Sequence, residues 1–185
     1  MSTRATIVLI GAPGAGKSSV GRLLGFRLGM RFADVDELIE DATGATVREI
    51  FADAGEAEFR RLEVEHTLGQ LSAAGVVALG GGAVMSEQIR DALTEASAEV
   101  RVVWLKVSGA RSVQRVGLNT ARPLLLGNVR GNLIRLLAER GPVYASVAHL
   151  TVDTDDQQPD DVVETIVTWL ADQPDHPAEP GGVSR

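Results

Sequence analysis

Gly11-Ala12-Pro13-Gly14-Ala15-Gly16-Lys17-Ser18 is the stretch that decides how this chain folds. It follows a run of β-branched and aliphatic residues at 6–10 and precedes a segment, 17–28, in which apolar residues recur at helical spacing. Glycines at these positions let backbone N–H groups surround a phosphate, and the next helix adds the positive end of its dipole. This order predicts a nucleotide site, the alternative being a glycine-rich turn without a ligand.

The residues of this loop have distinct expected roles. Lys17 can span the β- and γ-phosphates, and the Ser18 hydroxyl is positioned to ligate Mg²⁺. The residues predicted to bind the nucleotide here are Gly14, Ala15, Gly16, Lys17, Ser18 and Ser19.

Length and composition set the broad class of the protein. The 185 residues suit one domain, which we place at 1–172, followed by a disordered tail at 173–185 that is rich in proline. Without cysteine, a leader sequence or an apolar stretch of roughly 18 residues, we expect a cytoplasmic protein that binds no membrane. Acidic residues outnumber basic ones by 25 to 18, which argues against a nucleic-acid partner.

Short apolar runs alternate with helical patterns along the chain. The expected strands are 7–10, 32–35, 76–79, 100–107 and 150–152. The expected helices are 17–28, 46–51, 57–72, 86–96, 108–116, 130–139 and 160–171. The alternation predicts an α/β fold of three layers, with helices on both faces of a parallel sheet.

Chemically useful residues follow each of the first three expected strands. The phosphate loop follows the first, Asp34-Val35-Asp36 ends the second, and Gly80-Gly81-Gly82 follows the third. Ligands of open α/β sheets bind beyond the carboxyl ends of the strands, so these segments should meet at one cleft. The glycine triplet is either a plain turn or a place where the backbone approaches a ligand.

The two aspartates have two interpretations. If the extended conformation persists to Asp36, both carboxylates face the cleft. One could then hold Mg²⁺ through water while the other accepts a proton from a substrate hydroxyl. It is equally consistent with the sequence that Asp36 only caps a helix beginning at Glu37.

Three arginines suit anionic ligands, although each is also consistent with an ordinary surface residue. Arg60 lies three residues before Glu63, a spacing that can hold its guanidinium toward a carboxylate. Arg122 lies in a glycine-bounded segment, 117–128, that we expect to be a mobile loop able to close over phosphates. Arg140 precedes Gly141-Pro142, where we expect the helix to stop.

Over residues 5–171 the order of these motifs resembles shikimate kinase, a branch of the P-loop kinases similar to nucleoside monophosphate kinases. The residues that carry the likeness are the phosphate loop, Asp34-x-Asp36, Gly55-Glu56 with Phe59 to Glu63, Gly80 to Val84, Asn119 to Leu124, and Arg140 with Tyr144. The resemblance implies a five-stranded parallel sheet in the order 2-3-1-4-5, with a substrate-binding helical region at about 35–62 and a lid at about 114–127.

The resemblance also implies a reaction and an acceptor site. ATP would phosphorylate the 3-hydroxyl of shikimate, giving shikimate 3-phosphate and ADP in aromatic amino-acid biosynthesis. By position, Asp36, Arg60, Gly81 and Arg140 would contact shikimate, and the two arginines suit bidentate capture of its carboxylate. Asp36 would also orient or deprotonate the attacking hydroxyl.

For the donor, the resemblance implies that Lys17 and Arg122 stabilise the transferred phosphoryl group. Ser18 would bind Mg²⁺ directly and Asp34 would bind it through water. Arg115 matches a position that packs near adenine in the family.

The adenine end departs from the family pattern. Relatives often carry basic residues between the last strand and a proline, but this chain reads Thr154-Asp155-Asp156-Gln157-Gln158-Pro159. Backbone groups and Pro159 remain as the expected contacts to adenine.

Two other functions fit the same motifs. Another small-molecule kinase, such as a gluconate or nucleoside monophosphate kinase, would share the phosphate loop, but Arg60, Arg140 and Asp36 favour a carboxylated polyol. A non-catalytic ATP-binding module could use nucleotide state to switch a partner interface. Asp36 and Arg122 stand at positions suited to chemistry and favour an enzyme, which we expect to be a monomer.

Overall fold

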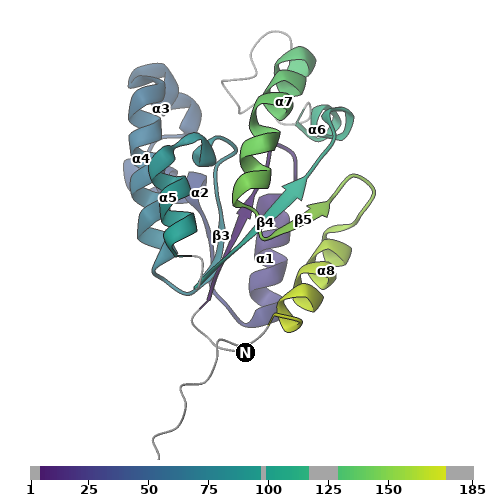
Figure 1. Cartoon of the computed structure of the whole chain (residues 1–185). Coiled ribbons are helices and arrows are strands. Elements are labelled where there is room, and N and C mark those ends of the chain that lie inside the picture. Colours follow the sequence, from purple (N-terminus) through teal and green to yellow (C-terminus); the bar gives the residue numbers. More distant parts are fainter. Residues whose placement is uncertain (1–4, 97–98, 117–128, 174–185) are drawn as a thin grey trace, which may run out of the picture.

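The computed structural model describes residues 5–96, 99–116 and 129–173. At its centre is a five-stranded parallel sheet in the order β2-β3-β1-β4-β5 (Figure 1). The strands are β1 (Thr6–Ile10), β2 (Phe32–Asp34), β3 (Gly75–Ala78), β4 (Val100–Lys106) and β5 (Leu150–Asp153). The predicted class and strand order are both confirmed.

Helices follow the strands along the chain. They are α1 (Lys17–Leu28), α2 (Val35–Thr43), α3 (Val47–Asp53), α4 (Gly55–Leu71), α5 (Glu87–Glu95), α6 (Gly109–Val116), α7 (Val129–Val147) and α8 (Pro159–Ala171), with a short 3-10 helix, η1 (Ala83–Met85). Most begin and end within a few residues of the predicted bounds, but α2 and the C-terminal part of α7 were not predicted.

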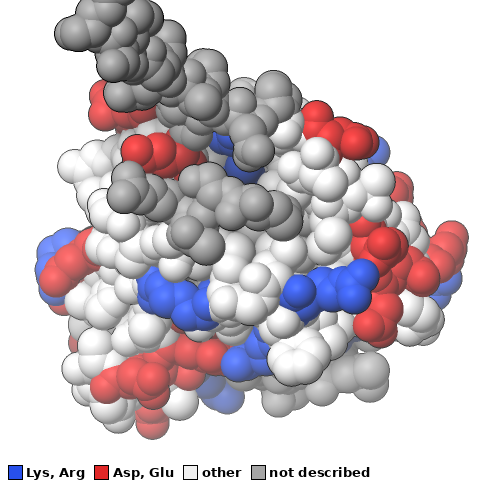
Figure 2. Space-filling view, turned by 90° about the horizontal axis from the view of Figure 1, so that it is seen from below, with Lys and Arg blue, Asp and Glu red and all other residues white. Residues whose placement is uncertain are grey.

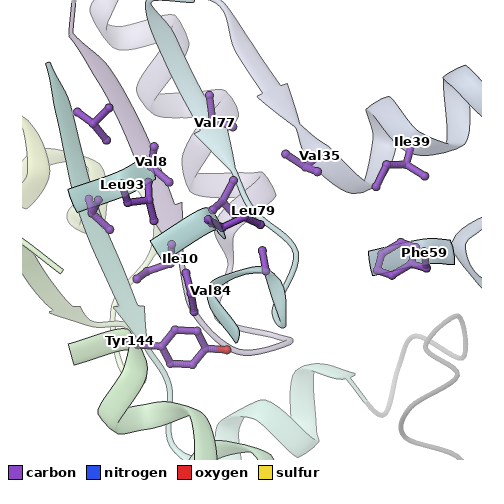
Figure 3. Packing of buried hydrophobic residues seen from close by; sticks show 14 of the residues in the cluster. Val8, Ile10, Val35, Ile39, Phe59, Val77, Leu79, Val84, Leu93 and Tyr144 are labelled. Atoms are coloured by element: carbon purple, nitrogen blue, oxygen red, sulfur yellow. The ribbon is translucent and has the colours of Figure 1, made fainter. Parts of the chain in front are cut away.

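The central strand β1 is buried on both faces, which makes the fold three-layered. Ile7 and Leu9 belong to an apolar cluster that includes residues of α1 and α8. Val8 and Ile10 belong to a second cluster, with residues of α2, α4, α5 and α7 (Figure 3). Alternate side chains of one strand thus support two helical layers, as expected for a parallel sheet.

The chain does not stay extended to Asp36, so the condition of the first interpretation of the two aspartates is not met. β2 ends at Asp34, and α2 begins at the next residue. Asp34 itself is the N-cap, since its Oδ1 accepts a hydrogen bond from the Asp36 backbone N–H at 3.1 Å. Backbone N–H groups in the first turn of a helix have no partner within the helix. The Asp34 carboxylate supplies one, which favours the start of a helix at this point. The alternative, in which Asp36 is the cap, is wrong.

The helix that carries Arg140 does not stop at Gly141-Pro142. It continues through Pro142 to Val147. Proline removes one backbone hydrogen bond, but Pro142 and the preceding turn at Ala138 are solvent-exposed, where water can bind the released carbonyl. Beyond the proline, burial of Tyr144 in the second cluster holds the helix on the sheet.

The amino-terminal ends of the strands form the face shown in Figure 2, where acidic and basic side chains lie side by side. Within the described ranges, no helix has both the length and the apolar character needed to cross a bilayer. The predicted site residues gather at the opposite end of the sheet, where the strands point in Figure 1.

Candidate active site

The phosphate loop between β1 and α1 has the backbone geometry that its sequence predicts. Gly11, Gly14 and Gly16 all have positive φ angles, of 145°, 78° and 90°. A Cβ at Gly11 would also overlap the carbonyl oxygen of Leu105, so glycine is required there on two grounds. The buried Lys17 ammonium donates to the carbonyl oxygens of Gly11 and Ala12, at 2.9 and 3.2 Å, and is thereby held across the loop.

A cavity of about 150 Å³ opens at this loop and also reaches the end of β2. Its lining residues include Gly14, Gly16, Lys17, Ser18, Ser19, Asp34 and Asp36. The two aspartates therefore reach the predicted cleft although the chain is helical from Val35 onward. The Ser18 hydroxyl donates to Asp34 Oδ2 at 2.6 Å. Two hard oxygen ligands beside a phosphate loop fit Mg²⁺, which usually takes few protein ligands and keeps several waters.

A larger cavity, of about 480 Å³, lies on the other side of the loop. Among its lining residues are Ala15, Gly16, Ser19, Arg111, Arg115, Thr154 to Pro159 and Val162. Arg115 donates to the carbonyl oxygens of Thr154 at 2.6 Å and of Gly14 at 3.2 Å. It therefore ties the phosphate loop to the loop after β5, and the predicted nucleotide residues Arg115 and Pro159 face one cavity.

The loop at 154–159 has no basic side chains, but α6 places arginines beside it. Arg111, which the sequence patterns did not single out, pairs with Asp156 at 2.5 Å. Ser112 also reaches the phosphate loop, because its hydroxyl donates to the Pro13 carbonyl at 2.6 Å. Both residues come shortly after β4 at the carboxyl edge, so the rule that ligands bind beyond strand ends, applied to the fourth strand, would have found them.

On the acceptor side, Arg60 of α4 is held by two carboxylates of its own helix. Nη1 donates to Glu63 Oε2 at 2.6 Å, and Nη2 donates to Glu56 Oε1 at 3.2 Å. The guanidinium carbon also lies 5.4 Å from the centre of the Phe59 ring. The predicted pairing of Arg60 with Glu63 is present, and it fixes the guanidinium beside the third strand's glycine turn.

Arg140 of α7 reaches the same turn from the opposite side. Its Nη1 donates to the Gly81 carbonyl oxygen at 2.7 Å, and the Tyr144 hydroxyl donates to the same oxygen at 2.5 Å. Both side chains are buried. Arg140 and Gly81, 59 residues apart in sequence, are therefore in direct contact.

The turn Gly80-Gly81-Gly82 is glycine because neighbouring side chains fill the space that a Cβ would need. A Cβ at Gly80 would overlap Glu63 Oε1 and lie 3.0 Å from Asp36 Oδ1. A Cβ at Gly82 would lie 2.6 and 2.7 Å from the Arg60 guanidinium nitrogens. The triplet thus lets the side chains of Arg60, Asp36 and Glu63 pack directly against the backbone of the turn.

The chain matches the family model described as shikimate kinase over residues 13–171. The chain belongs to the shikimate kinase family. It is 52% identical over 171 residues to a shikimate kinase from Thermobifida fusca, covering 92% of this chain and 97% of that protein.

Solved structures agree with this assignment. A shikimate kinase from Acinetobacter baumannii in complex with shikimate superposes with a TM-score of 0.85 at 37% identity, covering 91% of this chain and 94% of that one. The shikimate kinase from Aquifex aeolicus gives a TM-score of 0.76 at 32% identity, covering 90% and 96%. The resemblance predicted from the motifs is confirmed, and the chain is an ATP-dependent phosphotransferase.

The buried carboxyl of Glu63 lies near charges of both signs. Its side chain is 1% exposed, and within the described residues its Oε1 has no hydrogen-bond partner. Burial raises the pKa of Glu63 most, Arg60 and Arg140 oppose the rise, and Asp36 adds to it. Burial would lower the pKa of Arg60, but Glu63 and Glu56 outweigh it, so the pKa of Arg60 is raised.

One predicted catalytic residue, Arg122, lies outside the described residues, as do most of the predicted lid at 114–127 and the tail beyond Gln173. The other predicted site residues lie around the carboxyl ends of the five strands, at two cavities that share Gly16 and Ser19 and at the glycine turn.

Proposed function

We propose that this chain transfers the γ-phosphoryl group of ATP to the 3-hydroxyl of shikimate with the residues gathered at the carboxyl edge of the sheet. The observation that carries these assignments is the meeting of Arg60, Arg140 and Asp36 around the glycine turn at 80–82, next to the phosphate loop. Two arginines and one aspartate at the same turn suit a carboxylated polyol, because arginine binds carboxylates in a bidentate manner and the aspartate can accept hydrogen bonds from hydroxyls.

On the acceptor side, Arg60 and Arg140 bind the shikimate carboxylate, and the backbone of Gly81 closes the site against it. The glutamates beside Arg60 limit its rotamers, so little conformational entropy is lost on binding. Asp36 accepts a hydrogen bond from the 3-hydroxyl and takes its proton as the oxygen attacks the γ-phosphorus. The bond from that phosphorus to the bridging oxygen of ADP breaks, and ADP leaves.

On the donor side, Gly14, Ala15, Gly16, Ser18 and Ser19 place backbone N–H groups against the phosphates, and Arg115 and Pro159 border the adenine. Lys17 stabilises negative charge on the transferred group, and we assign the same role to Arg122 on its sequence alone. Ser18 directly and Asp34 through water would hold Mg²⁺, which would neutralise negative charge on the phosphates.

Water must be kept from the γ-phosphate during the reaction. We assign the helical region at 35–62 to cover shikimate and the segment 114–127 to cover ATP. Because the described site residues come from one chain, we also propose that the enzyme acts as a monomer, in the cytoplasm where ATP is available. Size-exclusion chromatography with light scattering tests the monomer: a mass near 19.5 kDa supports it.

The reaction is tested by measuring ADP release from MgATP with shikimate, with gluconate, with a panel of nucleoside monophosphates and with no acceptor. Release that depends on shikimate alone supports the proposal. Release with another acceptor would place the activity elsewhere among P-loop kinases. ATP binding without release in any sample would instead favour a nucleotide-dependent switch.

A further inference from the structure

Tyr144 is the only tyrosine of the chain, and it lies at the floor of the acceptor site. Its side chain is 1% exposed and belongs to the second apolar cluster with Ile10 and Val84 (Figure 3). The ring lies 5.7 Å from that of Trp104, at an interplanar angle of 34°. The hydroxyl is the polar end of a buried, tightly packed side chain, so its position is well defined.

The hydroxyl and Arg140 share a single acceptor. A carbonyl oxygen has two lone pairs, and that of Gly81 receives the Tyr144 hydroxyl at 2.5 Å and Arg140 Nη1 at 2.7 Å. Both donors project from α7 at positions i and i+4, which lie on one face of a helix. The Gly81 carbonyl is thus fixed from two directions, and the guanidinium is fixed with it.

The helix between the two donors is weakened at Pro142, which cannot donate its backbone hydrogen bond. Arg140 contacts the turn directly, and Tyr144, beyond the proline, supplies a second polar contact to the same carbonyl oxygen. Burial raises the pKa of Tyr144 most, while Arg140 lowers it, with a net rise. The hydroxyl consequently keeps its proton and remains a donor at physiological pH.

We propose that Tyr144 is a positioning residue for shikimate binding: its hydroxyl holds the Gly81 carbonyl, and through it the Arg140 guanidinium, in the geometry that receives the substrate carboxylate. The inference rests on the proposed function. It assigns Tyr144 an effect on the acceptor, because neither Tyr144 nor its partner Gly81 is among the residues that line the nucleotide cavity.

The test is Tyr144→Phe, which keeps the ring and removes the hydroxyl. The loss of one neutral hydrogen bond predicts a rise of roughly 3- to 10-fold in KM for shikimate, with kcat and the KM for ATP changed less than about twofold. The matched control is Thr6→Val, which removes another buried hydroxyl, bonded to the Leu71 carbonyl at 3.1 Å, at the far end of the sheet. It should lower the melting temperature without changing the KM for shikimate.

A second measurement does not depend on a substitution that alters the fold. Because the chain has one tyrosine, growth with 3-fluorotyrosine labels Tyr144 alone for ¹⁹F NMR. Saturating shikimate should shift the resonance, and ADP alone should shift it much less.

The outcomes separate the two proposals. A wild-type chain that does not phosphorylate shikimate would overturn both. If the wild type is active, then equal changes in both KM values for Tyr144→Phe, no change beyond that of Thr6→Val, or a ¹⁹F resonance insensitive to shikimate would overturn the role of Tyr144 alone.

Discussion

Replacing Arg60 with methionine should destabilise the fold, because it removes the closest partner of the buried Glu63 carboxylate. The two groups are 2.6 Å apart, with side chains 28% and 1% exposed. Removing one partner of a buried pair costs about 3–5 kcal/mol, and we expect about 2–3 kcal/mol here because Arg60 is partly exposed and Arg140 also attracts Glu63. For a chain of this length, that corresponds to a fall in melting temperature of roughly 4–12 °C.

The loss of stability should depend on pH in a definite direction. Burial raises the pKa of Glu63 in the folded state above its value in the unfolded chain, and removing Arg60 raises it further. Above about pH 4.5 the unfolded carboxyl releases its proton, while the folded one keeps it up to its raised pKa. The penalty of Arg60→Met therefore grows as pH rises from the folded pKa of Glu63 in the wild type to its higher folded pKa in the variant, and it shrinks toward acid, where Glu63 is protonated in both states.

Urea unfolding followed by circular dichroism, at several pH values, measures this penalty. The informative comparison is the double variant Arg60→Met/Glu63→Gln, which has no buried charge left without its partner. We expect it to recover most of the lost free energy of unfolding and its pH dependence, while the KM for shikimate stays high in both variants. A penalty that is independent of pH, or that Glu63→Gln does not relieve, would refute the reasoning.

Three further predictions concern the base, the sheet edge and α7. Asp36→Asn should lower kcat by at least about 100-fold while shikimate binding by calorimetry changes little, and a modest loss of kcat would mean that Asp36 only orients the hydroxyl. His149 Nδ1 accepts the Val102 N–H at 2.9 Å, and burial, with a smaller effect of Arg101, lowers the pKa of His149. Stability should therefore fall below about pH 6.5, where the unfolded imidazole takes up a proton first, and a His149→Gln variant that retains this fall would contradict the assignment. Pro142→Ala restores a backbone donor within α7 and should stabilise the chain by about 1–2 kcal/mol in urea unfolding, an unchanged midpoint being the contrary result.

The sequence alone predicted those features that depend only on residues close together in the chain. The glycines at 11, 14 and 16 have the positive φ angles that the phosphate-loop pattern predicts, because that loop needs them whatever surrounds it. The apolar runs predicted that β1 and β3 are buried, and their alternation with helical patterns predicted the fold class. The strand order was predicted only from the family resemblance of the motifs. The Arg60–Glu63 pair also follows from spacing on one helix.

The tertiary structure decided the features that depend on residues far apart in the chain. No local pattern places the Tyr144 hydroxyl and Arg140 on the carbonyl of Gly81, about 60 residues earlier, or brings Arg111 to Asp156, 45 residues later. The length of α7 also depends on tertiary contacts. Pro142 predicts that the helix ends there, but burial of Tyr144 stabilises the helix beyond the proline. Local preferences are worth a few kcal/mol at most, and the packing of a buried aromatic ring outweighs them once the sheet provides the surface.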